Sequence, residues 1–199
     1  MHAITDGLID EPVFTVYLER KGPVENVEGG VFTWGGVDTQ NCAAHVDYFP
    51  LSSNSTWSFQ VDSISLGNYS TTPVKSALSD TGSGAIFAPQ ADVDAIAKEL
   101  KAVKELKAVK VGDNYALPCD GNPDLVFTVG GKPFPIKTEN YVVDTGPKII
   151  QGVKYCLLGI APNRNIDKWT LGSPFIRQFC QIYDVGQKRI GFAQPISQP

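Results

Sequence analysis

Short extended runs recur along almost the whole chain, and each is followed within a few residues by glycine, proline, asparagine or aspartate. Apolar and β-branched runs of this length, with such breakers between them, are typical of short β-strands joined by turns. The clearest runs are 13–18, 31–34, 45–51, 57–66, 74–78 and 125–129. The pattern therefore predicts an all-β fold.

Two pairs of runs have the spacing of hairpins. Residues 125–129 and 132–136 are separated by Gly130-Gly131, a two-residue turn signal. Residues 181–184 and 189–193 are separated by four residues. Pro133 and Pro135 cannot donate backbone hydrogen bonds, so the arm that carries them is expected at the edge of its sheet.

One segment, at about 90–108, predicts the main helix, and we expect one or two short helices in all. Apolar residues recur there at helical spacing, and Asp92 and Asp94 fall in the first turn, where the helix dipole favours acidic groups. These apolar residues are Val93, Ile96, Ala97, Leu100 and Val103. The hexapeptide Lys-Glu-Leu-Lys-Ala-Val occurs at both 98–103 and 104–109, which we interpret as a local duplication that lengthened the helix.

Length and composition exclude several classes of protein. The 199 residues, 42% of them hydrophobic, suffice for one globular domain, and no linker interrupts them. The net charge of −4 argues against a nucleic-acid partner, because proteins that bind nucleic acids usually carry a basic face. No apolar run reaches the roughly 18 residues that span a bilayer, so we expect no membrane partner.

Cysteines and glycosylation sequons point to an oxidising compartment. The cysteines are four in number, and the sequons begin at Asn54 and Asn68. We therefore expect a secreted or lysosomal glycoprotein whose signal peptide lies upstream, because the first ten residues do not resemble one. The cysteines show no metal-ligand spacing, and we expect neither a metal nor another cofactor.

The segment 79–84, Ser-Asp-Thr-Gly-Ser-Gly, carries the candidate chemistry. It follows an extended run, so Asp80 is placed on a tight turn in which Thr81 fixes the loop, Gly82 allows close backbone approach and Ser83 orients the carboxylate. A second Asp-Thr-Gly begins at Asp144. It is followed by Pro-Lys rather than a hydroxyl residue, and we interpret it as a strand end rather than as a partner of Asp80.

The motif at 80–83 resembles the active-site motif of the pepsin-like aspartic peptidases, with invertebrate digestive and lysosomal members the most similar in character. Other segments resemble the C-terminal lobe of that family in order and spacing: 6–9 with 14–18, 30–38, 48–51 with 57–59, 123–127, 169–172 with 175–179, and 183–184 with 189–193. The resemblance covers nearly the whole chain. It implies one domain over residues 1–199, a single pepsin-like lobe, with the N-terminal lobe absent.

The resemblance also implies roles for individual residues. Asp80 is the catalytic aspartate, and its loop is supported by Thr81, Gly82 and Ser83. The residues implied to line the half-cleft are Leu78, Gly84, Ile86 and Thr170. Ser79, Gly84 and Thr170 depart from the commonest family pattern, since an apolar residue usually precedes the aspartate, a second hydroxyl often follows the motif and an aliphatic residue is usual at 170.

The resemblance extends to the cysteines. Cys119 and Cys156 match the disulfide typical of this lobe, and Cys42 and Cys180 are then expected to pair with each other. Four cysteines allow three connectivities, and two free buried thiols are the alternative for the second pair.

The implied function is aspartic-type endopeptidase activity on peptide or protein substrates. That reaction uses two carboxylates that hold one proton between them, so a lobe with Asp80 alone is expected to be inactive without its missing lobe. The alternatives are an active homodimer and a non-catalytic secreted binding or decoy protein. Exposed strands that would join the missing lobe also predict self-association. With only His2 and His45 present, serine or cysteine chemistry is not favoured.

Overall fold

Strands dominate the computed structural model, and they form four sheets. The structure describes residues 2–22, 24, 26–72, 75–102, 109–111, 114–150, 152–163 and 168–196. The expected all-β class is confirmed.

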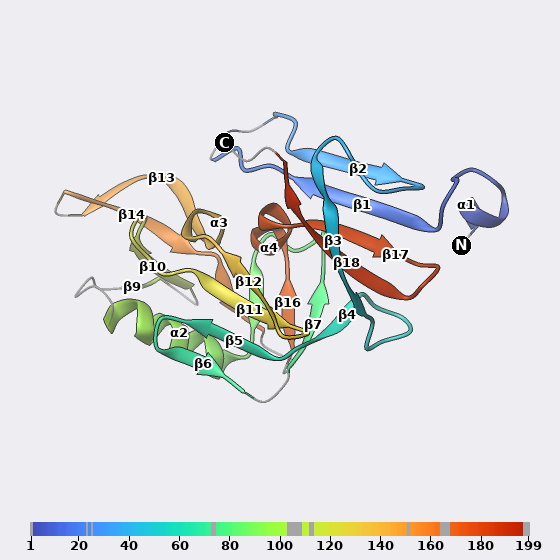
Figure 1. The fold of residues 1–199 in the computed structure, drawn as a ribbon. Helices are drawn as coiled ribbons and strands as arrows, with labels where there is room; N and C mark the ends of the chain where they lie inside the picture. The colour runs from blue at the N-terminus through green and yellow to red at the C-terminus, as the bar shows by residue number, and fades with distance from the viewer. Residues whose placement is uncertain are drawn as a thin grey trace.

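The first sheet is antiparallel throughout and has five strands (Figure 1). In spatial order they are β2 (Gly30–Trp34), β1 (Val13–Leu18), β17 (Cys180–Asp184), β18 (Arg189–Pro195) and β3 (Cys42–Pro50). The predicted hairpin of 181–184 with 189–193 is the β17–β18 pair, with Tyr183 opposite Ile190. β2 lies at one free edge of this sheet and β3 at the other.

The second sheet is mixed and carries the candidate motif. Its order is β15 (Ile160–Pro162), β8 (Ile86–Ala88), β16 (Trp169–Leu171), β7 (Lys75–Ser79) and β4 (Ser58–Val61). β16 runs parallel to β7, whereas β4 runs antiparallel to it. The predicted run 74–78 corresponds to β7, and its first residue lies outside the described residues.

Two four-stranded sheets complete the structure. One has the order β12 (Lys132–Ile136), β11 (Leu125–Val129), β5 (Ser63–Leu66), β6 (Tyr69–Thr71). The other has the order β13 (Val142–Ile150), β14 (Val153–Leu158), β10 (Asn114–Pro118), β9 (Val109–Val111). The Gly130-Gly131 hairpin forms as predicted, and the proline-bearing strand β12 is at the edge.

The sequence run 57–66 proves to be two strands, β4 and β5, in different sheets. Asp62 interrupts it, because its backbone N–H donates to the Thr128 carbonyl oxygen and its side chain accepts a hydrogen bond from the Gly131 N–H, 2.8 Å in each case. The alternation of apolar residues changes phase at this break, from Phe59 and Val61 to Ile64 and Leu66, so the sequence carries a local signal of two strands that treating 57–66 as one run overlooks.

The main helix is α2 (Gln90–Ala102), whose apolar face of Val93, Ile96, Ala97 and Leu100 is buried. The predicted continuation through residues 103–108 lies outside the described residues. Three further helices are α1 (His2–Thr5), α3 (Thr138–Tyr141) and α4 (Ser173–Gln178). The number of helices therefore exceeds the one or two expected. These three helices are too short for the 3.6-residue period to show in the sequence.

Aromatic rings fill the core between the sheets and α4. Phe175 and Phe192 are both buried, with ring centroids 5.2 Å apart, and Phe127 packs edge-on against Trp169 at 5.5 Å. Edge-to-face pairs of this kind add to the stability that area burial gives. Among the described residues, no helix is long and apolar enough to cross a membrane.

Both expected disulfides are present. Cys119 is joined to Cys156 and Cys42 to Cys180, with sequence separations of 37 and 138 residues. In a chain-entropy account, closing loops of this size stabilises the folded state by about 3–5 kcal/mol each. The second disulfide ties the edge strand β3 to the inner strand β17.

Candidate active site

Asp80 lies directly after β7, on the turn that leads to β8. Its backbone N–H donates to the Leu171 carbonyl oxygen of the neighbouring parallel strand at 3.1 Å, so two strands fix the position at which the turn begins. The turn closes on itself through a hydrogen bond from the Ser83 N–H to the Asp80 carbonyl oxygen, 3.2 Å. The aspartate is thus held on rigid elements of the second sheet.

Each carboxylate oxygen of Asp80 has its own donor. Oδ1 accepts from the Gly82 backbone N–H at 3.0 Å, and Oδ2 accepts from the Ser83 hydroxyl at 2.7 Å. Hydrogen bonds to an ionised carboxylate are short and stronger than neutral ones. The two donors fix the plane of the carboxyl group, while Thr81 and Gly82 are exposed and leave the turn accessible from one side.

The segment that leads from β16 into α4 packs directly against the backbone of this turn. The Ser173 backbone N–H and hydroxyl both donate to the Ser83 carbonyl oxygen, at 2.8 and 3.2 Å. A Cβ atom on Gly172 would lie 2.2 Å from that oxygen and 2.4 Å from the carbonyl oxygen of Ala85. Only glycine fits there, which explains the glycine after the apolar run 169–171.

Ser79, the departure from the family pattern, belongs to a buried polar network. Its hydroxyl donates to Gln181 Oε1 at 3.2 Å and lies 2.7 Å from the Tyr183 hydroxyl. Because a hydroxyl has one hydrogen, Tyr183 must be the donor in the second bond. Gln181 Nε2 continues the chain to the Phe179 carbonyl oxygen at 2.9 Å. All three side chains are buried, and their polar groups are matched.

The electrostatics of this network keep the Tyr183 phenol protonated. Burial raises the pKa of Tyr183, and the negative charge of Asp80 raises it further, while the hydrogen bond with Ser79 acts in the opposite direction. A protonated phenol is the donor that the network requires. The motif marks Ser79 as unusual, but no sequence signal points to Gln181 and Tyr183, which lie more than 100 residues away in the sequence.

Asp144 occupies a different sheet and has different partners. It lies in β13, where its Oδ1 accepts from the Gly146 N–H at 3.0 Å and its Oδ2 pairs with the Lys154 ammonium. The bond to Lys154 and the Gly146 amide lower the pKa of Asp144. Among the described residues, no hydrogen bond joins Asp80 to a second carboxyl group.

Of the residues expected in the half-cleft, three reach the surface. Leu78 and Thr170 are neighbours on parallel strands and are half-buried, and Gly84 is exposed. Ile86 is 0% exposed. The Ile86 side chain belongs to the hydrophobic core and does not line the surface of this chain.

The remaining candidates lie outside the turn. Asn54 is exposed on the loop between β3 and β4, and Asn68 is exposed on the β5–β6 turn, where its side chain donates to Glu99 at 3.0 Å. His45 is 83% exposed and contacts Asp47 at 3.3 Å. Within the part of the chain that the structure describes, no three His, Cys, Asp or Glu side chains gather as metal ligands would.

Comparisons with known proteins match nearly all of this chain. The family model for eukaryotic aspartyl proteases matches residues 2–195. Aspartic protease 6 of Caenorhabditis elegans is 39% identical over 100% of this chain and 49% of that protein, and Aspartic protease 17 of the same organism is 40% identical over 93% and 47%. Pepsin A of Suncus murinus is 28% identical over 94% and 46%. The chain spans about half the length of these relatives.

Proposed function

The chain belongs to the eukaryotic aspartyl protease family, and from this premise we propose that it is the C-terminal lobe of an aspartic endopeptidase, contributing Asp80 as one of two catalytic carboxylates. The observation that carries the proposal is the seat of Asp80. Its carboxylate is accessible, fixed by two donors and placed at the end of a strand in the second sheet.

The chemistry requires a second carboxylate beside the first. When two carboxyl groups share a site, they hold one proton between them, because placing two negative charges together is costly. The ionised group takes a proton from the attacking water, and the protonated group donates to the peptide carbonyl oxygen. Gly82 and Ser83 hold Asp80 in the orientation that such sharing needs.

The second carboxylate is proposed to come from another lobe. Asp144 is unsuited to the role, because its carboxylate is engaged by Lys154 and by the Gly146 amide. The half-length match to the relatives supports a partner lobe of similar size. On this proposal, the lone chain has no acid beside its base and does not cleave peptides.

The substrate on this account is an extended peptide that passes over the turn. Leu78, Thr170 and Gly84 are proposed to form its half-cleft, with Ile86 supporting them from the core. Thr81, Gly82 and Ser83 are proposed to support the catalytic carboxylate. Asn54 and Asn68, both exposed, are proposed glycosylation sites of a secreted or lysosomal protein.

A homodimer is the second candidate, and one observation favours it. The edge strand β2 exposes a contiguous apolar row, in which Phe32 is 46% and Trp34 63% exposed. An uncovered apolar edge of this kind promotes pairing with another chain. Two copies of the chain could pair through this edge. For such a dimer to be active, the pairing would also have to bring the two Asp80 residues together.

The proposal is tested by supplying the missing lobe. The chain is refolded with the separately produced N-terminal half of Aspartic protease 6 of C. elegans, and cleavage of a quenched fluorescent protein substrate is measured at about pH 3–5, where one shared proton is expected. We expect cleavage that a pepsin-type transition-state inhibitor blocks and that Asp80→Asn removes. A stable complex that cleaves equally well with Asp80→Asn would contradict the proposal.

A further inference from the structure

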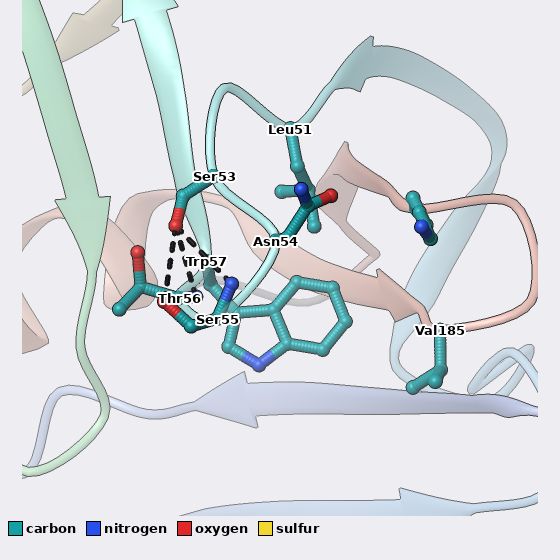
Figure 2. A pocket seen from close by; sticks show the side chains of 8 residues that line it. Leu51, Ser53, Asn54, Ser55, Thr56, Trp57 and Val185 are labelled. Carbon is teal, nitrogen blue, oxygen red and sulfur yellow. Dashed lines mark hydrogen bonds between the residues drawn. The ribbon is translucent and has the colours of Figure 1, made fainter.

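A pocket of about 200 Å³ lies between the loop that joins β3 to β4 and the turn that joins β17 to β18. Figure 2 shows the Trp57 indole at its centre, with Leu51 on one side and Val185 on another. Pockets that enclose whole drug-sized ligands are larger, roughly 300–1,000 Å³. The size and the apolar walls therefore suit a single side chain rather than a complete small molecule.

Hydrogen bonds within the loop make one wall of the pocket rigid. The Ser53 hydroxyl oxygen accepts from the backbone N–H groups of Ser55 and Thr56, 3.2 Å in each case (Figure 2). The Thr56 hydroxyl lies 2.9 Å from that of Ser58. Trp57 is fixed from behind by Tyr183, whose ring centroid is 4.9 Å away at 72°. A wall that is already ordered costs little conformational entropy when a ligand binds.

Lys188 supplies the only charged side chain among the residues that line this pocket. Its backbone is held in the left-handed region, with φ of 50°, and its carbonyl oxygen accepts from the Leu51 N–H at 3.0 Å. The turn and the loop are thereby tied together. Within the described residues, Lys188 forms no ion pair, so its ammonium is available to a ligand.

The pocket adjoins the strand that carries Asp80. The Ser79 N–H donates to the Trp57 carbonyl oxygen at 3.0 Å, and Ser58 pairs with Leu78. Because β4 and β7 are antiparallel, Thr56 follows on the side toward the Asp80 turn. The pocket and the Asp80 turn thus lie at the same end of the β4–β7 pair, and the proposal below places an extended peptide, which advances about 3.3 Å per residue, across both.

We propose that this pocket is a subsite for an acidic side chain of the peptide substrate, and that Lys188 determines its charge preference. A glutamate fits these surroundings best, because its methylene groups pack on Trp57 and Leu51 while its carboxylate meets the Lys188 ammonium and the loop hydroxyls. The inference rests on the proposed endopeptidase function, since it treats the ligand as substrate.

The test measures peptide binding to the chain itself and needs no catalysis. Capped hexapeptides of apolar residues carry one Glu, Gln or Lys at each position in turn. They are titrated into chain produced without glycans, because Asn54 lines the pocket, and the indole N–H signal of Trp57 is followed by NMR. A Trp57→Phe variant assigns that signal among the three tryptophans.

We expect the best Glu peptide to bind about threefold more tightly than its Gln counterpart, the size of a partly exposed ion pair. Lys188→Glu should reverse the order, so that the Lys peptide binds best. Lys98→Glu, an equal change of charge on the exposed face of α2, should leave the order as it is in the unmodified chain.

Two results would overturn the proposal. One is an unchanged order of affinity of the three peptides in Lys188→Glu. The other is no shift of the Trp57 signal up to about 10 mM peptide, a concentration at which even millimolar binding would be seen. Failure of the endopeptidase function would be seen separately, in the two-lobe cleavage assay. If the peptides show the charge preference but the two-lobe assembly does not cleave, the pocket remains a site for acidic peptides and the endopeptidase proposal fails. If the assembly cleaves but the peptides show no charge preference, only the subsite proposal fails.

Discussion

Asp80 and Asp144 begin two Asp-Thr-Gly segments, the first a turn after β7 and the second within strand β13, and in both the aspartate Oδ1 accepts a hydrogen bond from the glycine amide two residues later, at 3.0 Å. The second carboxylate oxygen distinguishes them. In the first turn it meets the neutral Ser83 hydroxyl, whereas in the second it meets the Lys154 ammonium. A neutral donor leaves the carboxylate free to share a proton with another acid, and an ammonium opposes that. The same tripeptide therefore holds its aspartate in two different chemical environments.

The surroundings of the two Asp-Thr-Gly segments differ as well. The first is supported from below by Gly172 and Ser173 and, through Ser79, by a buried polar network. The second lies where the pairing register of β13 with β14 shifts between Val143 and Lys148, and its Gly146 has φ of 103°. Support by a packed sheet marks the turn with the proposed catalytic role.

The sharpest way to break this comparison is to replace each aspartate by asparagine in the two-lobe assembly. Asp80→Asn should lower the cleavage rate by about 10²–10⁴-fold, the contribution typical of general acid–base groups. Asp144→Asn should leave the rate within about twofold, because a group outside the reacting site changes no transition-state interaction. Equal losses in the two variants, measured with the fluorescent substrate, would contradict the assignment.

The next largest effect is expected on stability, from the glycines of the two regions. Gly172→Ala should destabilise the chain by about 3 kcal/mol, because its Cβ would overlap two backbone carbonyl oxygens. Gly146→Ala meets no atom within 4 Å and should cost only about 1 kcal/mol of backbone strain. Urea unfolding of both variants gives the two values, and the reverse order would show that the first turn is not tightly supported.

The buried network beneath the first turn gives the third prediction. Ser79→Ala removes the acceptor of the buried Tyr183 hydroxyl and should cost about 2 kcal/mol of unfolding free energy. Tyr183→Phe removes the donor, so the double variant should lose less than the sum of the two single losses. Additive losses in this cycle would mean that the 2.7 Å contact does not couple the two side chains.

The smallest effect is a pH dependence of stability that comes from the Asp144–Lys154 pair in the second segment. Lys154 lowers the pKa of Asp144 below its ordinary value of about 3.9, so the pair contributes stability above that pH and loses it as the pH falls through the lowered pKa. Asp144→Asn should thus be slightly less stable than the unmodified chain at pH 6, and the difference should shrink as the pH falls below about 3.9. Both groups are partly exposed, so the difference should also shrink in high salt. A difference that stays constant as the pH falls from 6 through the acidic range would contradict this origin.

Much of the fold could be predicted from the sequence, because its signals are local. The Gly130-Gly131 hairpin, the prolines of an edge strand and the apolar face of α2 each depend on residues close together in the chain. The resemblance supplied the disulfide pairing and the position of Asp80. What the sequence missed is non-local. The phase shift of the apolar alternation marks the break at Asp62, but the sheet that each half joins depends on Thr128 and Gly131, which lie in another strand and its turn.

In the site, too, local features could be predicted from the sequence and long-range contacts could not. Ser83 lies three residues from Asp80, so its role follows from the motif. The partners of Ser79 and the burial of Ile86 depend on how distant strands pack, which no short-range pattern encodes. The pocket at Lys188 combines two segments from distant parts of the chain, 51–57 and 185–188, and no sequence pattern predicts it.

The central claim is that this chain holds one half of a two-carboxylate site. Its most direct test is cleavage of the fluorescent protein substrate at about pH 3–5 by the folded, disulfide-intact chain alone, beside its Asp80→Asn variant, over a range of concentrations that sedimentation shows to be monomeric. The account predicts no difference between the two proteins. Cleavage by the monomer that a pepsin-type inhibitor blocks and that Asp80→Asn removes would contradict it.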